Sequence, residues 1–234
     1  MIYDLIIVTQ SNGSLIQNTQ NCIDSARGEC DLNVILVETG QPYKYNVDKI
    51  IDYNGEFNYN RALNLGLKHS KGDVHILANN DIIFHEGWSV IGASMKANGY
   101  HSASALSQDP RQKDFKRGDF VYEGYNIGSH LTGWCIFADR YCIQEIGKLD
   151  ESVSFWYSDD LYACQLKAAG IRHGLFCNVQ VDHLTSATLS KQPSRVQRQY
   201  QRGELGKFLQ RQKYYAEQDR SRRERIYKSN TANI

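Results

Sequence analysis

The segment VHILANND, residues 74–81, decides the fold of this chain, because an apolar run ends there in two amides and a carboxylate. Val74 to Leu77 is predicted to be the third strand of the sheet. The turn signal Lys71-Gly72-Asp73 precedes this run, and Asn79-Asn80-Asp81 follows it. We therefore predict a central strand that delivers three polar side chains to its C-terminal edge.

Two more apolar runs lie upstream, and each is followed by a polar loop. LIIV (residues 5–8) is followed by Thr9–Asn12, and VILV (residues 34–37) by Glu38–Gly40. Helical patterns separate the runs, which is typical of parallel strands joined by crossover helices. We predict an α/β fold with a Rossmann-like, open and mostly parallel sheet flanked by helices. The three polar loops would share the edge at which such sheets bind ligands.

The second half of the chain is less regular. Residues 101–130 contain turn signals and several tyrosines, and they are predicted to form an irregular surface excursion. A strand is predicted over 134–137 and a last strand over 176–181. Between them, a helix is predicted from Ser158 to about Ala169, where Gly170 ends it.

Composition limits the class of protein. With 234 residues, 41% hydrophobic and 23% charged, the chain has the composition of a soluble globular protein with a sizeable core. No apolar run approaches the roughly 18 residues of a membrane helix, and the N-terminus lacks the pattern of a signal peptide. Six cysteines without a C-x-x-C pair predict reduced, buried thiols and a cytoplasmic protein.

Charge is divided unevenly along the chain. From Ala187 to Ile234 there are 12 Lys and Arg against 4 Asp and Glu, a net charge of +8, whereas the residues before Ala187 carry −7. We therefore expect a domain over residues 1–186 and a basic, Arg/Gln-rich helical extension over residues 187–234. Such a basic segment on an acidic body predicts an anionic partner.

Several segments, in this order, resemble a family 2 glycosyltransferase with the GT-A fold. They are YDLIIVT (3–9), VILVETG (34–40), NRALNLGL (60–67), NND (79–81), TG through IGKLDE (132–151), FWYSDD (155–160) and DHLTS (182–186). Asn79-Asn80-Asp81 stands where the family carries Asp-x-Asp, in a form similar to rhamnosyltransferase-like members. Tyr162 departs from the family, which frequently has a second Asp there. The resemblance makes residues 1–82 the donor half and residues 83–186 the acceptor half.

The resemblance implies a nucleotide-sugar donor, of UDP or dTDP type, and a divalent metal, Mn²⁺ or Mg²⁺. Asp81 and His183 would ligate the metal, with phosphate oxygens and water at the other positions. A histidine ligand favours Mn²⁺ over Mg²⁺. Asn79 and Asn80 offer only carbonyl dipoles, so metal binding is expected to be weak without the nucleotide. The alternative for the Asn-Asn-Asp segment is a turn with local side-chain bonds.

An acceptor hydroxyl needs a base, and two carboxylates follow Ser158 at a predicted helix start. The family match gives the base role to Asp160, and Asp159 would bind or orient the acceptor hydroxyl. A helix N-terminus favours a charged carboxylate, although both residues could simply cap the helix. Direct displacement with inversion at the sugar carbon is the expected mechanism.

The other expected contacts divide between the two halves. Those to the donor are assigned to Thr9, Asn12, Glu38, Arg61, Asn64, Asn79 and Asn80. Those to the acceptor are assigned to Gly133, Trp134, Trp156 and Asp159. Plain alternatives are a solvated helix residue for Arg61 and core packing for the two tryptophans.

The expected function is therefore a metal-dependent, inverting hexosyl- or pentosyltransferase. For the acceptor we favour a polyanion, first a modified base of (phage) DNA, because of the basic extension and a second basic cluster at Arg111, Lys113, Lys116 and Arg117. A cell-envelope or O-antigen glycan at an anionic membrane surface is the alternative, and the extension could also be a solvated helix without a ligand.

A nucleotidyltransferase would need a basic loop after the first strand, and Ser11-Asn12-Gly13-Ser14 has no Lys or Arg. An inactive nucleotide-sugar-binding module is the last alternative, since the metal motif has lost one carboxylate. Oligomeric state does not follow from the sequence.

Overall fold

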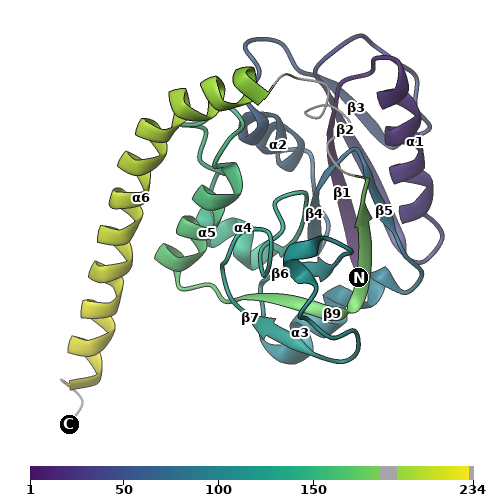
Figure 1. Cartoon of the computed structure of the whole chain (residues 1–234). Helices are drawn as coiled ribbons and strands as arrows, with labels where there is room; N and C mark the ends of the chain where they lie inside the picture. Colours follow the sequence, from purple (N-terminus) through teal and green to yellow (C-terminus); the bar gives the residue numbers. More distant parts are fainter. Residues whose placement is uncertain (185–193, 232–234) are drawn as a thin grey trace.

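One nine-stranded sheet with helices on both faces makes up the body of the protein in the computed structural model, which describes residues 1–184 and 194–231 (Figure 1). The strands are β1 (Ile2–Thr9), β2 (Asp31–Glu38), β3 (Lys49–Asp52), β4 (Val74–Asn79), β5 (Ile82–Phe84), β6 (Ser102–Leu106), β7 (Val121–Glu123), β8 (Cys135–Asp139) and β9 (His173–His183). The α-helices are α1 (Ser14–Ala26), α2 (Tyr59–Leu67), α3 (Ile91–Asn98), α4 (Arg140–Ile146), α5 (Ser158–Ala169) and α6 (Ser194–Thr231). Two short 3₁₀ turns, η1 (Trp88–Val90) and η2 (Pro110–Gln112), complete the elements.

The sheet is parallel in its N-terminal half and mixed beyond β4. Its order is β3-β2-β1-β4-β8-β6-β9-β5, with β7 paired to β9. β1 runs parallel to β2 and β4, and β2 runs parallel to β3. β8 is antiparallel to both β4 and β6, whereas β6 and β9 are parallel. The parallel character predicted for the sheet therefore belongs to its N-terminal half.

Two apolar cores, one on each face of the sheet, follow from the alternation of side chains along each strand. On β1, Leu5 and Ile7 belong to the core that α1 and α3 cover. Ile6 and Val8 belong to the other core, which α2, α4 and α5 cover. Because both faces of β1 are covered, its sequence is an unbroken apolar run at residues 5–8.

The segment predicted to be irregular over residues 101–130 contains a fully buried central strand, β6. Its sequence is Ser-Ala-Ser-Ala-Leu, which lacks the bulky residues that mark a strand. Ser102 and Ser104 instead bond the buried ring of His173 on the neighbouring β9, at 2.8 and 3.2 Å. Burial lowers the pKa of His173 to about 3, so the ring is neutral and serves as a partner for the two hydroxyls. The prediction of an irregular segment was wrong for residues 102–106 for this reason.

The basic extension forms one helix of 38 residues, α6, which packs against α5 and continues past the body (Figure 1). At 1.5 Å per residue the helix is about 57 Å long. Glu204, Phe208 and Arg211 lie on the side that meets the body. Among the described residues, no helix combines the length and the apolar character needed to cross a bilayer. Each of the six cysteines is a free thiol, and four of them are buried.

Gly66 sets the close approach of α2 to β1. A Cβ atom at this position would overlap a methyl group of Ile6. We expect Gly66→Ala to lower the free energy of unfolding by about 1–3 kcal/mol, because the helix must move away from the sheet. Chemical denaturation measures this change. The matched control is Gly206→Ala on α6, where a Cβ meets no atom within 4 Å and alanine should add about 0.5–1 kcal/mol. Equal effects of the two substitutions would contradict the packing described.

Candidate functional site

Asp81 and His183 face each other where β4 and β9 end. Ile82 of β5 pairs with His183 of β9, and the backbone oxygen of Asp81 accepts from the N–H of Leu184 at 2.9 Å, so the sheet fixes both side chains. The Oδ1 atom of Asp81 lies 3.2 Å from the Nε2 atom of His183. Asp81 is only 5% exposed. Both facing atoms are buried, and neither has a hydrogen-bond partner in the structure.

The pair fits a divalent cation. Two buried ligand atoms without hydrogen bonds are costly unless something else binds them. Their separation of 3.2 Å is close to the roughly 3 Å between adjacent ligands of an octahedral ion with bonds of about 2.1 Å. Within residues 1–184 and 194–231, no third His, Cys, Asp or Glu joins them. The chain alone would therefore hold a cation weakly, and a ligand with anionic oxygens would have to complete the site.

Trp134 forms the wall beside this pair. Its ring stacks on the ring of His183, with centroids 5.0 Å apart and planes 8° apart. The guanidinium of Arg111 lies over the same indole, 5.3 Å from the ring centroid. Arg111 is held in turn by Asp109, whose two carboxylate oxygens each accept from it at 2.9 Å. The arrangement fixes the orientation of the imidazole next to Asp81.

A cavity of about 300 Å³ opens between the two halves of the domain. Residues from both halves line it, among them Asn79, Gly133, Trp134, Trp156, Asp159 and His183. The absence of a side chain at Gly133 lets Asp159 approach, since a Cβ there would lie 2.6 Å from its Cβ and 2.7 Å from its Oδ2. All four residues assigned to the acceptor from the sequence therefore meet in one cavity, together with the predicted metal ligand His183.

The two adjacent carboxylates differ in their surroundings. Burial, together with the charge of Asp160, raises the pKa of Asp159 to about 6. Burial also raises the pKa of Asp160, although that residue is not among those lining the cavity. The N–H of Asp160 donates to Oδ1 of Asp159 at 3.0 Å, which leaves Oδ2 directed at Gly133. Of the two, Asp159 is the one placed to meet a ligand.

The asparagines of the Asn-Asn-Asp segment have different contacts. Asn79 lines the cavity, and its Oδ1 accepts from the Tyr59 hydroxyl at 2.8 Å. The amide of Asn80 points the other way and donates to the hydroxyl of Thr19 at 3.1 Å and to that of Thr9 at 3.4 Å. Asn80 and Thr9 therefore join β1, α1 and β4, and neither lines the cavity.

Glu38 organises the loops at the same edge. One of its oxygens accepts from the N–H groups of Ser11 at 3.0 Å and Gly40 at 2.7 Å, and the other accepts from the Ser11 hydroxyl. The carboxylate is buried, whereas Asn12 in the adjacent loop is exposed. Glu38 thus holds two loop backbones together. Of Glu38 and Asn12, both expected to contact the donor, Asn12 is the one whose side chain is exposed.

Arg61 and Asn64 are turned toward the acceptor half. Arg61 donates to Glu151 at 3.0 Å, and the amide of Asn64 donates to the same carboxylate and to the backbone oxygen of Leu149, each at 2.9 Å. Asn64 also accepts from the N–H of Leu149 at 2.9 Å. Both residues hold the loop before α5 and are not among those lining the cavity.

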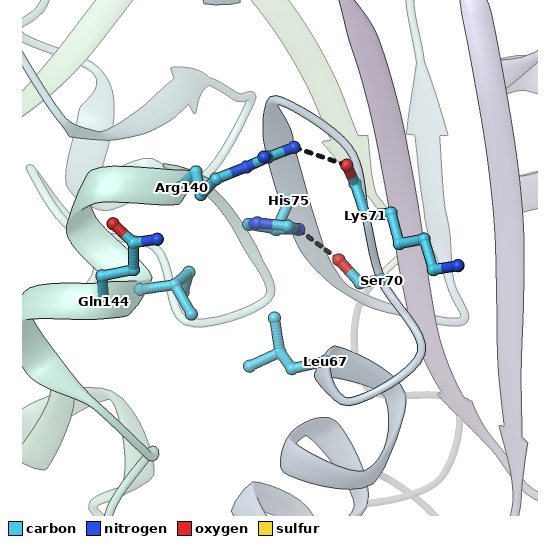
Figure 2. Close-up of a pocket in the computed structure, with 7 residues that line it drawn as sticks. Leu67, Ser70, Lys71, His75, Arg140 and Gln144 are labelled. Atoms are coloured by element: carbon cyan, nitrogen blue, oxygen red, sulfur yellow. Dashed lines mark hydrogen bonds between the residues drawn. The ribbon is translucent and has the colours of Figure 1, made fainter.

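A second cavity, of about 450 Å³, lies where β4 begins, away from Asn79 and the other polar ends (Figure 2). Arg140 donates there to the backbone oxygen of Lys71 at 2.6 Å, and His75 bonds Ser70, as Figure 2 shows. Burial lowers the pKa of His75, so its ring is neutral. These polar groups stabilise the turn before β4. The cavity beside His183 is the one that brings together carboxylates, an imidazole and tryptophan rings.

The assignment from sequence did not include several residues that line the cavity, among them Tyr59, Asp109 and Arg111. Tyr59 opens α2, and its hydroxyl is buried against Asn79. Arg111 was noted only as part of a basic cluster. Its place over Trp134 depends on Gln112, which bonds Ser107 and the backbone oxygen of Ser129, a contact between distant segments. Thr185 and Ser186, which complete the segment DHLTS, lie outside the described residues.

Comparison with known proteins identifies the fold. No family model and no curated protein matches the sequence. Among solved structures, GalNAc-T7 with UDP, GalNAc and Mn²⁺ is similar, with a TM-score of 0.61 and 12% identity over 78% of this chain and 43% of that chain. S. aureus TarS 1–349 in complex with UDP-GlcNAc has a TM-score of 0.59 and 11% identity over 82% of this chain and 62% of that chain. This chain thus spans less than two thirds of either protein.

The predicted GT-A fold is confirmed by these similarities together with the mixed sheet and its flanking helices. At 11–12% identity the likeness concerns the fold. Function has to be argued from the residues of the site.

The Asp81–His183 pair predicts metal binding that depends on nucleotide. Isothermal titration should show weak binding of Mn²⁺ alone and tighter binding in the presence of UDP, because the diphosphate supplies the remaining ligands. Asp81→Asn and His183→Ala should each weaken this binding at least about tenfold. Asp52→Asn, which removes an exposed carboxylate from β3, should leave it unchanged. Equal binding by all four proteins would contradict the assignment of the pair.

Proposed function

We propose that this protein is a metal-dependent, inverting glycosyltransferase that uses a nucleotide sugar, with a UDP sugar as the first candidate. The observation that carries the proposal is the single cavity shared by His183, which faces Asp81, and Asp159, a half-buried carboxylate with a raised pKa. A cation site and a base are the two groups that metal-dependent, inverting transfer from a nucleotide sugar uses. The GT-A fold supports the proposal by analogy, since GalNAc-T7 was solved with UDP and Mn²⁺ and TarS with UDP-GlcNAc.

We assign the base to Asp159 in preference to Asp160, which the sequence favoured. Asp159 lines the cavity and approaches Gly133, whereas Asp160 supplies the charge that helps to raise the pKa of its neighbour. Asp109 also lines the cavity, but both of its oxygens bind Arg111. Asp159 is therefore the better placed carboxylate to receive a proton.

In the proposed reaction the acceptor hydroxyl gives its proton to Asp159 as its oxygen bonds to the anomeric carbon of the donor. The bond from that carbon to the diphosphate oxygen breaks, and the diphosphate leaves with the electron pair. One displacement inverts the configuration at the carbon. Asp81 and His183 would hold the cation, which offsets the charge that the diphosphate gains. Trp134 and Trp156 offer flat apolar faces on which a sugar or a base can stack.

Substituting each carboxylate separately tests the base. Asp159→Asn should lower transfer by about 10²–10⁴-fold while UDP binding is retained, and Asp160→Asn should lower it less than about tenfold. Products of a panel of nucleotide sugars and acceptors, including hydroxymethylated DNA, are followed by mass spectrometry. A full transfer rate in Asp159→Asn would contradict the assignment. Transfer of a nucleotidyl group would support a nucleotidyltransferase, and UDP-sugar binding without any transfer would support an inactive binding module.

The pH dependence follows from the raised pKa of Asp159. A carboxyl with a raised pKa takes up its proton at higher pH, so the base form is lost as the pH falls through about 6. The rate of transfer should therefore decline below this pH. Asp160→Asn removes a neighbouring negative charge, lowers the pKa of Asp159 and should move the decline to lower pH. A rate profile that is identical in the two proteins would contradict this coupling.

For the acceptor we propose a polyanion, with nucleic acid ahead of an anionic glycan or membrane surface. Exposed basic side chains along α6 support this proposal: Arg202, Lys207, Lys213, Arg220 and Arg225. Arg211 does not contribute, because it pairs with Asp150 at 2.6 Å. Deletion of the helix would also remove contacts to the body, so substitution of exposed residues is the cleaner experiment.

The triple substitution Lys213→Gln, Arg220→Gln and Arg225→Gln should weaken DNA binding and lower the slope of log affinity against log salt by about 1 for each lost phosphate contact. The matched control removes the exposed charges of Lys44, Lys68 and Lys96. Binding to vesicles of phosphatidylserine but not to DNA would favour a membrane surface. Binding to neither would contradict a polyanionic acceptor.

A further inference from the structure

The C-terminal helix α6 contacts the segment that leads into the candidate base. Residues 150–157 join the loop after α4 to the start of α5, and they carry Trp156, three residues before Asp159. We propose that α6 is a positioning element of the active site and that Glu204 is its key positioning residue. This inference rests on the proposed function for its catalytic consequence, whereas its structural consequence is measured independently.

Glu204 binds the backbone of this segment with both carboxylate oxygens. Oε1 accepts from the N–H and the hydroxyl of Ser154. Oε2 accepts from the N–H groups of Phe155 at 3.3 Å and Trp156 at 2.8 Å. Glu204 is only 7% exposed, so these bonds form away from water and are stronger for it. One side chain of α6 therefore satisfies three successive backbone N–H groups beside the cavity.

Tyr157 has an unusual backbone conformation that α6 helps to maintain. Its φ of 65° lies in the left-handed region, and no other non-glycine residue in the described parts of the chain has a positive φ. A tyrosine disfavours this conformation, which persists only where the surroundings fix it. The ring of Tyr157 stacks on Phe208 of α6, with centroids 4.7 Å apart and planes 5° apart. The helix thus holds the residue whose backbone turns the chain into α5.

A third contact fixes the start of the segment. Arg211 and Tyr215 of α6 both donate to Oδ2 of Asp150, at 2.6 and 2.8 Å. The other oxygen of Asp150 accepts from the N–H and the hydroxyl of Ser152, at 2.9 and 2.6 Å. These bonds lower the pKa of Asp150, although burial acts in the opposite direction and is the largest single influence. The carboxylate therefore stays charged between its two sets of donors.

The opposite side of the segment is held by α2. Asn58 donates to the backbone oxygens of Glu151 and Val153, each at 2.9 Å. The N–H of Tyr59 donates to the backbone oxygen of Ser154 at 2.7 Å, and the Tyr59 hydroxyl bonds Asn79. The segment is thus clamped between α2 and α6, and the same contacts reach the Asn-Asn-Asp motif.

The experiment compares Glu204→Gln with Glu217→Gln, an exposed glutamate on the same helix. Both changes remove one negative charge, but only the first replaces an oxygen that accepts from backbone N–H groups with an NH₂ group, which cannot accept. In the full-length protein, hydrogen–deuterium exchange of the amides of residues 154–156 should become at least about tenfold faster in Glu204→Gln, with exchange in β1 and β4 unchanged. Glu217→Gln should exchange like the unsubstituted protein.

Activity provides the second measurement. Glu204→Gln should lower kcat of sugar transfer by about tenfold or more while the Kd for UDP with Mn²⁺ changes less than about twofold. Unchanged exchange at residues 154–156 would overturn the clamp, whether or not the protein transfers a sugar. Faster exchange with unchanged kcat would overturn the positioning role. If Glu204→Gln does not fold, Phe208→Leu takes its place with the same expected and contradicting results. This change removes the ring that stacks on Tyr157 and keeps an apolar side chain in the cluster with Val153 and Leu161.

Discussion

The site depends on a buried carboxylate and a buried imidazole that face each other without a hydrogen bond. Leaving such groups unpaired costs about 1–3 kcal/mol each, so the fold must impose the arrangement. The register of β5 on β9 does so, because it brings Asp81 and His183 together from positions far apart in the chain. Trp134 stacks on the imidazole and keeps the ring from turning away. A cation shared with a diphosphate, as we propose, would recover this cost.

Most of the other polar residues near this edge form hydrogen bonds within the protein that connect loops and elements. Glu38 joins two loops, Asn80 joins three elements, and Asn64 with Arg61 fixes the loop before α5. From the other side, Glu204 fixes the same region. None of these five residues lines the cavity, so they support it from outside. Rigid support of this kind is what electrostatic catalysis requires, since the groups need not reorganise during the reaction.

The sequence predicted those features that depend on local pattern. The apolar runs of β1, β2 and β4 and the stop of α5 at Gly170 were predicted correctly, because burial on both faces and a left-handed cap leave local signals. The strand β6 was missed, because small residues suffice where His173 satisfies its serines. The choice between Asp159 and Asp160 could not be made from adjacency. We base it on the cavity, which Asp159 lines, and on the close approach of Asp159 to Gly133, a residue of another segment.

The central claim is that Asp81 and His183 hold a cation together with the diphosphate of the donor. Anomalous diffraction from a crystal grown with Mn²⁺ and UDP tests it most directly. The account predicts one manganese peak within bonding distance of Oδ1 of Asp81, Nε2 of His183 and the diphosphate oxygens. Bound UDP with no manganese at this pair, or with manganese held elsewhere, would contradict it.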